Sequence, residues 1–173
     1  MKSLADEKSM HSIHSTLRER IVEHIFVGEA MRWLWQHHKT DVEVLRSEFD
    51  AGGYDLVMSL EKIERHIQLK TSLFDGKAAD IKASRKLMDK PGGCIIWILV
   101  TSGLEIHSYR WLGGLPGQPL PDILAGTVTA KHTKANAKSV KAERPDHRVI
   151  PLSKFDHLFS LDDVMVRLFG PLK

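Results

Sequence analysis

Residues 54–71 read YDLVMSLEKIERHIQLKT, and this stretch decides which fold the chain is expected to adopt. Residues 54–60 and 63–71 carry aliphatic side chains in the alternating pattern of β-strands. The polar pair Glu61–Lys62 between them has the length of a tight turn. We therefore predict two antiparallel strands joined as a hairpin.

The second of these strands has two distinct faces. Successive side chains of a strand point to opposite sides of the sheet. His66, Gln68 and Lys70 therefore share one face, and Ile67 and Leu69 share the other. The strand is expected to turn an apolar face to the core and a polar face to a site.

Outside the hairpin, helical and strand patterns alternate along the chain. The expected helices are 16–38, 77–88 and 160–169, and the further strands are 42–50, 94–101, 104–110 and 148–152. The apolar run CIIWILVT at 94–101 suits a strand buried on both faces. A strand–helix–strand crossover makes it parallel to 63–71, with 104–110 antiparallel to it. This order, αβββαβ, predicts an α/β fold with a mixed central sheet flanked by helices and a C-terminal extension.

Two of the helices carry start signals. Thr16 with Glu19 three residues later forms a capping-box pattern, and Ser160 precedes Asp162 and Asp163. We expect these two helices to begin directly after Thr16 and Ser160.

The 173 residues suit a single domain. Within it we expect a flexible segment at 1–15, the core at 16–101, and additional strands, a basic segment and a helix at 102–173. The Gly- and Pro-rich stretch 113–121 should be irregular, and the structure of 127–142 is ambiguous from its sequence.

Composition excludes several classes of protein. The single cysteine, Cys94, rules out a disulfide framework and a cysteine-based zinc site. The N-terminal residues lack the apolar stretch of a signal peptide, and the longest apolar run, Cys94 to Val100, is too short to cross a bilayer. We expect a cytoplasmic protein with no membrane contact.

Three polar residues of the hairpin can form a metal-dependent site. Counting outward from the Glu61–Lys62 turn, Asp55 lies opposite the region of Gln68 and Lys70. Hard divalent cations take oxygen ligands, and they polarise a bound phosphate. A nearby lysine stabilises charge that develops in the transition state. The set predicts Mg²⁺- or Mn²⁺-assisted phosphodiester cleavage. The alternative is that all three residues are structural: Asp55 a turn residue, Gln68 a plain polar strand position and Lys70 a surface lysine.

Glu29 is a candidate fourth member of this site. At 100° per residue, Val22, Ile25, Phe26 and Trp33 form one apolar helix face, with Glu29 at its centre. A buried carboxylate is costly unless it is paired or binds a metal. Glu29 could reach the same spot as the hairpin residues, or it could be a glutamate that pairs with an arginine.

The order of these features resembles the PD-(D/E)xK nuclease superfamily, which includes restriction endonucleases and Holliday-junction resolvases. The features are a helix carrying Glu29, then Gly53–Val57, then Ile67–Lys70, then a helix and an apolar strand. The similarity covers residues 16–101 and implies a restriction-endonuclease-like core.

The resemblance also implies a role for each site residue. Asp55 would be the principal ligand of Mg²⁺ or Mn²⁺, and the main-chain carbonyl of Leu69 would be another. Gln68 occupies the position that usually holds Glu or Asp. Lys70 would orient the attacking water or stabilise charge, and Glu29 would match an acidic residue on the first helix of some members.

Basic residues gather in two further segments. The candidate phosphate contacts are Lys82, Arg85, Lys86, Lys131, Lys134, Lys138 and Lys141. If 127–142 is helical, its four lysines form one stripe. Solvated faces that bind nothing explain both clusters equally well.

Three functions follow from these observations. The first is a metal-dependent endonuclease that hydrolyses DNA, in which a homodimer would cut both strands. The second is a catalytically inactive nucleic-acid-binding or interaction protein with the same fold. The third is an unrelated α/β domain in which these residues are structural. Metal binding through Asp55 discriminates between the first and the second.

Overall fold

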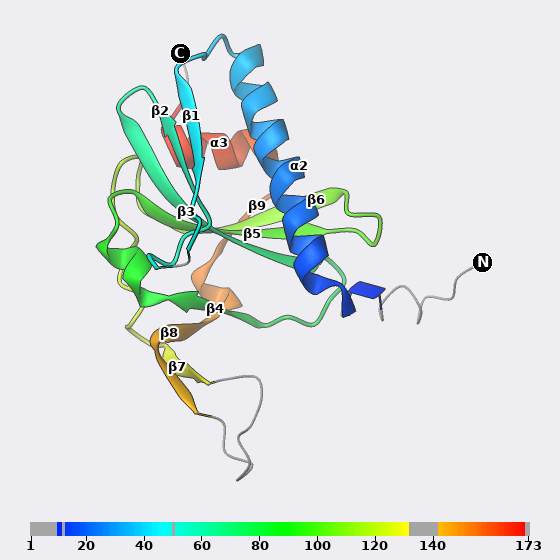
Figure 1. Cartoon of the computed structure of the whole chain (residues 1–173), viewed down its shortest axis with the longest axis vertical. Coiled ribbons are helices and arrows are strands. Elements are labelled where there is room, and N and C mark those ends of the chain that lie inside the picture. Colours follow the sequence, from blue (N-terminus) through cyan, green and yellow to red (C-terminus); the bar gives the residue numbers. More distant parts are fainter. Residues whose placement is uncertain (1–9, 12, 50, 132–141, 172–173) are drawn as a thin grey trace, which may run out of the picture.

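A computed structural model describes residues 10, 11, 13–49, 51–131 and 142–171. A six-stranded mixed sheet carries two helices on one face and a three-stranded sheet toward the other (Figure 1). The general α/β class is confirmed. No helix within the described ranges is long and apolar enough to cross a membrane.

The elements have the following bounds. The helices are α2 (Ser15–Gln36) and α3 (Leu161–Phe169). The six-stranded sheet has, in spatial order, β1 (Val42–Arg46), β2 (Leu56–Leu60), β3 (Ile63–Leu73), β5 (Gly93–Val100), β6 (Ile106–Gly113) and β9 (Asp156–Leu158). The smaller sheet has β4 (Asp80–Ser84), β8 (Glu143–Pro151) and β7 (Val128–Lys131). Two 3₁₀ segments are η1 (Arg85–Asp89) and η2 (Leu152–Lys154).

The hairpin of β2 and β3 forms as predicted, and its register places the candidate site. The ladder runs from Leu60 paired with Ile63 to Leu56 paired with Ile67. β3 continues to Leu73, six residues beyond the last β2 partner. The second half of β3 therefore has no β2 residue beside it.

The strands after the hairpin also follow the prediction. β3 pairs in parallel with β5 over eight residues, and β6 runs antiparallel to β5. Alternate side chains of β5 enter two separate cores, because both faces of the strand are covered. Ile96 and Ile98 pack beneath α2 and α3, and Ile95 and Trp97 pack toward the smaller sheet. The prediction of a doubly buried strand is confirmed.

The helix predicted at residues 77–88 is wrong. Its place is taken by β4 and η1, so the crossover from β3 to β5 contains no α-helix. β4 pairs antiparallel with β8, and Ile81 and Ala83 are buried at alternate positions. Pairing with a distant strand has overridden a local helix preference, which is a weak determinant of structure.

Two smaller predictions also need correction, and a segment that the sequence left ambiguous is now assigned. Thr16 is not a cap, since α2 begins at Ser15 and helical hydrogen bonds continue back to Met10. The strand predicted at the edge, 148–152, is the end of β8, which lies between β4 and β7. The segment 127–142, ambiguous from its sequence, contains strand β7 in its described part.

The start of α3 matches the prediction. Ser160 accepts a hydrogen bond from the Asp163 N–H at 3.1 Å, and the Asp163 carboxylate accepts from the Ser160 N–H at 3.1 Å. Hydrogen bonding to Ser160 lowers the pKa of Asp163. The two residues form a capping box that fixes the first turn.

Arg65 fastens the C-terminal helix to the sheet. It is fully buried on β3, and its guanidinium donates to four main-chain carbonyls. The Leu168 and Arg167 carbonyls lie 2.8 Å away, and those of Gly114 and Gln118 lie at 3.1 and 3.3 Å. Burial lowers the pKa of Arg65. The Arg65 guanidinium supplies hydrogen-bond donors to carbonyls in the last turn of α3, which have no partners within the helix.

Candidate functional site

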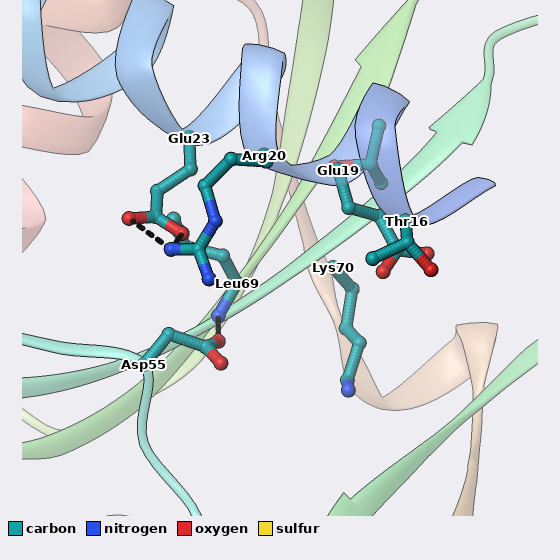
Figure 2. Close-up of a pocket in the computed structure, with 8 residues that line it drawn as sticks. Thr16, Glu19, Arg20, Glu23, Asp55, Leu69 and Lys70 are labelled. Carbon is teal, nitrogen blue, oxygen red and sulfur yellow. Dashed lines mark hydrogen bonds and ion pairs between the residues drawn. The ribbon is translucent and has the colours of Figure 1, made fainter. Parts of the chain in front are cut away.

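A cavity of about 180 Å³ lies where β3 continues past the first residue of β2 and α2 passes over β3 (Figure 2). Its lining residues come from the first turns of α2, the residue directly before β2 and the middle of β3. They are Thr16, Glu19, Arg20, Glu23, Asp55, Leu69, Lys70 and Thr71. Three of the residues predicted for the site, Asp55, Leu69 and Lys70, therefore share one cavity.

Asp55 is held in place beside β3 by its own main chain and its carboxylate. Its N–H donates to the Ile67 carbonyl at 2.9 Å, and its carbonyl accepts from the Ser47 N–H at 3.1 Å. Its Oδ2 accepts a hydrogen bond from the Leu69 N–H at 2.6 Å. The carboxylate thus takes the place of a strand partner for Leu69, which gives it a fixed position at the cavity (Figure 2).

The carbonyl of Leu69 faces the same side as this carboxylate. In an extended strand the N–H and C=O of one residue point to the same neighbour, and successive residues alternate. His66 and Phe74 direct their N–H groups to the β5 side, at Gly92 and Val100. Odd-numbered residues of β3 therefore direct theirs to the opposite edge. The Leu69 oxygen is directed toward the cavity.

Lys70 and Gln68 have different surroundings although they share a face of β3. Lys70 is partly exposed and lines the cavity, and Figure 2 shows its side chain on the other side of Leu69 from Asp55. Gln68 does not line the cavity and is only 5% exposed. Its Oε1 is buried and has no hydrogen-bond partner among the described residues. Buried acceptors of this kind are rare in folded proteins.

The charged residues of α2 at this cavity were missed by the sequence analysis. Both oxygens of Glu23 bind Arg20, at 2.9 and 3.1 Å, and Oε1 also accepts from Arg46 at 2.8 Å. Glu19 and Thr16 lie one turn further toward the N-terminus. Their spacings of three and four residues place all four on one side of a helix, and this spacing was the available signal.

The prediction that Glu29 reaches this site is wrong. Glu29 lines a separate cavity with Tyr109 and His107. Burial, together with the Glu29 carboxylate, raises the pKa of Tyr109. The buried face of α2 also includes Val27 and Ala30, so its centre is rotated away from Glu29. Glu29 is also six residues beyond Glu23, about 9 Å along the helix.

The predicted phosphate-binding residues lie around the smaller sheet. Lys82 donates to the Lys131 carbonyl at 2.8 Å. Arg85 and Lys86 lie 3.5 and 3.6 Å from the Asp146 carboxylate. None of these four residues lines the cavity at Asp55. The remaining three candidates, Lys134, Lys138 and Lys141, lie outside the described residues.

The Asp55 carboxylate and the Leu69 carbonyl are oxygen donors of the kind that a hard divalent cation binds. Over the described part of the chain, no three His, Cys, Asp or Glu side chains are arranged to hold a metal ion. The donor set predicted here is a different one: the Asp55 carboxylate and the Leu69 carbonyl at the cavity, and the Gln68 amide, which does not line it. Mg²⁺ and Mn²⁺ accept oxygens of all three kinds. The Gln68 Oε1 is buried without a hydrogen-bond partner among the described residues, and Gln68 does not line this cavity.

The fold and the cavity together define an α/β protein with a charged site at the point where two antiparallel strands separate. No protein-family model matches the chain, and no curated protein is similar to it in sequence. A functional assignment must therefore come from the chemistry of the site.

Proposed function

We propose that this protein is a metal-dependent endonuclease of the PD-(D/E)xK kind that hydrolyses phosphodiester bonds in DNA. The observation that supports this best is the position of Asp55. Its carboxylate is bound to the Leu69 N–H in a cavity that also contains Lys70. A fixed carboxylate beside a lysine and a main-chain carbonyl meets the requirements of metal-assisted phosphate chemistry.

In this proposal each group has a defined task. Asp55, the Leu69 carbonyl and Gln68 Oε1 would hold Mg²⁺ or Mn²⁺. The bound ion would lower the pKa of a water molecule and polarise the phosphate. Lys70 stabilises negative charge that develops on the phosphate in the transition state. Arg20 supplies a second cation at the cavity and is suited to contact a phosphate oxygen.

The restriction-endonuclease-like core is part of the same proposal. It is supported by the order of α2, the β1–β2–β3 meander and a β5 strand parallel to β3. The chain departs from that core in its crossover, where β4 and η1 replace the helix. This departure leaves the site intact, because β4 and η1 contribute none of its lining residues.

A second candidate is a nucleic-acid-binding protein that keeps the site without cleaving. Two observations favour it: Gln68 is neutral, and Glu23 is engaged by two arginines. Titration calorimetry with Mn²⁺ and Mg²⁺ separates the candidates. The endonuclease should bind the ion, and Asp55→Asn should lose that binding. A wild-type chain that binds neither ion excludes the endonuclease and leaves the binding protein.

Replacement of Gln68 by glutamate should strengthen metal binding. The variant adds a second carboxylate to the ligand set, and we expect the Mn²⁺ affinity to rise at least tenfold. Without metal, a carboxylate at this buried position should lower the free energy of unfolding by about 1–3 kcal/mol. Saturating Mn²⁺ should reverse that loss, because a ligand bound to the native state stabilises it.

The matched control is Gln36→Glu, since Gln36 is exposed at the end of α2. It should leave the metal affinity unchanged and lower the free energy of unfolding by no more than about 1 kcal/mol, because a carboxylate at the end of a helix opposes the helix dipole. Equal Mn²⁺ affinities for the Gln68→Glu variant and the wild type would show that Gln68 is not a ligand.

A further inference from the structure

A second cavity lies between α2, the turn that joins β5 to β6, and the segment that leads into α3. Its volume is about 500 Å³, which is the size of a small-molecule site. Glu29 lines it from α2, Glu105 from the turn, and Tyr109 from β6. We call it the acidic cavity, after Glu29 and Glu105.

The acidic cavity contains two carboxylates and no lysine or arginine. Within the described ranges, neither Glu29 nor Glu105 forms an ion pair. Glu23, at the other cavity, is by contrast engaged by two arginines. Because uncompensated charges of one sign in a cavity raise the local concentration of counter-ions, this cavity attracts cations and repels phosphate.

Tyr109 adds a hydroxyl group that has no partner in the protein. The residue is only 3% exposed, and its ring packs edge-on against Phe26 in the main core. Among the described residues its hydroxyl makes no hydrogen bond, although the oxygen is not enclosed by protein atoms. The oxygen is therefore the part of Tyr109 that reaches the cavity. Buried tyrosine hydroxyls usually have a hydrogen-bond partner, and a ligand with a donor group would supply one here.

Apolar side chains surround these polar groups. Ile25, Leu104 and Leu161 line the cavity, and Phe159 is 74% exposed beside them. An exposed aromatic ring attracts a cation to its face. Aliphatic side chains gain free energy when they cover the methylene groups of a ligand. The lining therefore fits an organic cation with an aliphatic stem.

We propose that the acidic cavity binds an aliphatic diamine or polyamine. One ammonium group binds Glu29 and donates to the Tyr109 hydroxyl, and a second binds Glu105. The methylene chain between them contacts the leucine and isoleucine side chains. Two carboxylates from separate elements match a ligand with two separated positive charges, because each can accept charge-assisted hydrogen bonds from its own ammonium group.

A metal ion fits this cavity less well than an amine. Over the described part of the chain, no three His, Cys, Asp or Glu side chains are arranged to hold one. The acidic cavity also shares no lining residue with the cavity at Asp55. The inference therefore does not depend on the proposed nuclease activity, and amine binding can be measured without metal or DNA.

Titration calorimetry of the full chain, in EDTA and at low ionic strength, tests the binding with putrescine, spermidine and butylamine. Putrescine and spermidine should bind. Butylamine has a single ammonium group and leaves one carboxylate unpaired, so it should bind about tenfold more weakly than putrescine. A protein that binds neither putrescine nor spermidine, or that binds butylamine as tightly, would overturn the proposal.

A lysine side chain of a partner protein carries the same ammonium group on an aliphatic stem. Nα-acetyl-lysine amide, titrated in the same way, distinguishes this source from a free amine. It has one positive charge and should bind more weakly than putrescine. Binding as tight as that of putrescine, or tighter, would assign the cavity to a protein partner and reject the diamine.

Substitutions at the cavity test where the amine binds. Glu29→Gln and Tyr109→Phe should each weaken putrescine binding about tenfold, the cost of losing one hydrogen bond to a charged group. Glu105→Gln should reduce the affinity for putrescine to that of butylamine. Because the Tyr109 hydroxyl has no partner among the described residues, its removal should leave the fold intact.

The matched control is Glu43→Gln, since Glu43 is exposed on β1, at the opposite edge of the sheet from β6 and β9. It removes the same charge and should bind putrescine with the wild-type affinity. An equal loss in Glu43→Gln would mean that the amine follows the overall charge of the protein. That result, or wild-type affinity in both Glu29→Gln and Tyr109→Phe, would contradict binding in the acidic cavity.

Discussion

Replacement of Lys70 by alanine should reduce the rate of metal-dependent DNA cleavage by about 10²- to 10³-fold, the usual cost of removing one group that stabilises transition-state charge. Lys70 is a strand residue that lines the cavity beside Asp55 and Leu69. The side chain is partly exposed, so its removal should leave the fold and Mn²⁺ binding nearly unchanged. Rates of plasmid nicking at saturating Mn²⁺ measure the effect.

The matched control is Lys62→Ala, in the exposed turn of the same hairpin. It should cut at the wild-type rate. Lys70→Arg keeps the charge but changes the position of the donors, and it should lie between alanine and wild type. Wild-type cleavage by Lys70→Ala would show that the lysine has no catalytic role.

Replacement of Arg65 by methionine should lower the free energy of unfolding by about 3–5 kcal/mol, the range for breaking a buried charge network. The variant leaves four main-chain carbonyls without their donor, two of them in the last turn of α3. Buried acceptors without partners are costly. Denaturation by urea, followed by circular dichroism, gives the difference.

Arg85→Met is the control for this experiment. Arg85 pairs with Asp146 at 3.5 Å on the surface, where both side chains are about half exposed. Exposed ion pairs contribute about 0–1 kcal/mol. Similar losses for the two variants would mean that the carbonyl contacts of Arg65 do not hold α3 in place.

The hairpin and the strands beside it could be predicted because their determinants are local. Alternating side chains and a two-residue turn fix the pairing of β2 with β3, and the apolar run at 94–101 indicates burial on both faces. The segment at 77–88 could not be predicted in the same way. Its strand pairs with β8, whose residues lie 63 to 71 positions further along the chain, and only that distant partner makes it a strand.

The residues of the candidate site also differ in whether local sequence determines their positions. Asp55, Leu69 and Lys70 were predicted because the hairpin register alone brings them together. The acidic residue of α2 was misassigned, because choosing Glu23 over Glu29 depends on how the helix rotates against the sheet. Arg65 gave no signal, since its carbonyl partners come from segments that are far away in sequence.

Incubation of supercoiled plasmid and branched DNA with the full chain, with Mg²⁺, Mn²⁺ or EDTA, tests the central claim most directly. We predict cleavage only with a divalent ion, and none by Asp55→Ala, which lacks the carboxylate bound to the Leu69 N–H. A wild-type protein that binds metal but never cuts, or an Asp55→Ala variant that cuts at the wild-type rate, would contradict the assignment of this cavity as a nuclease site.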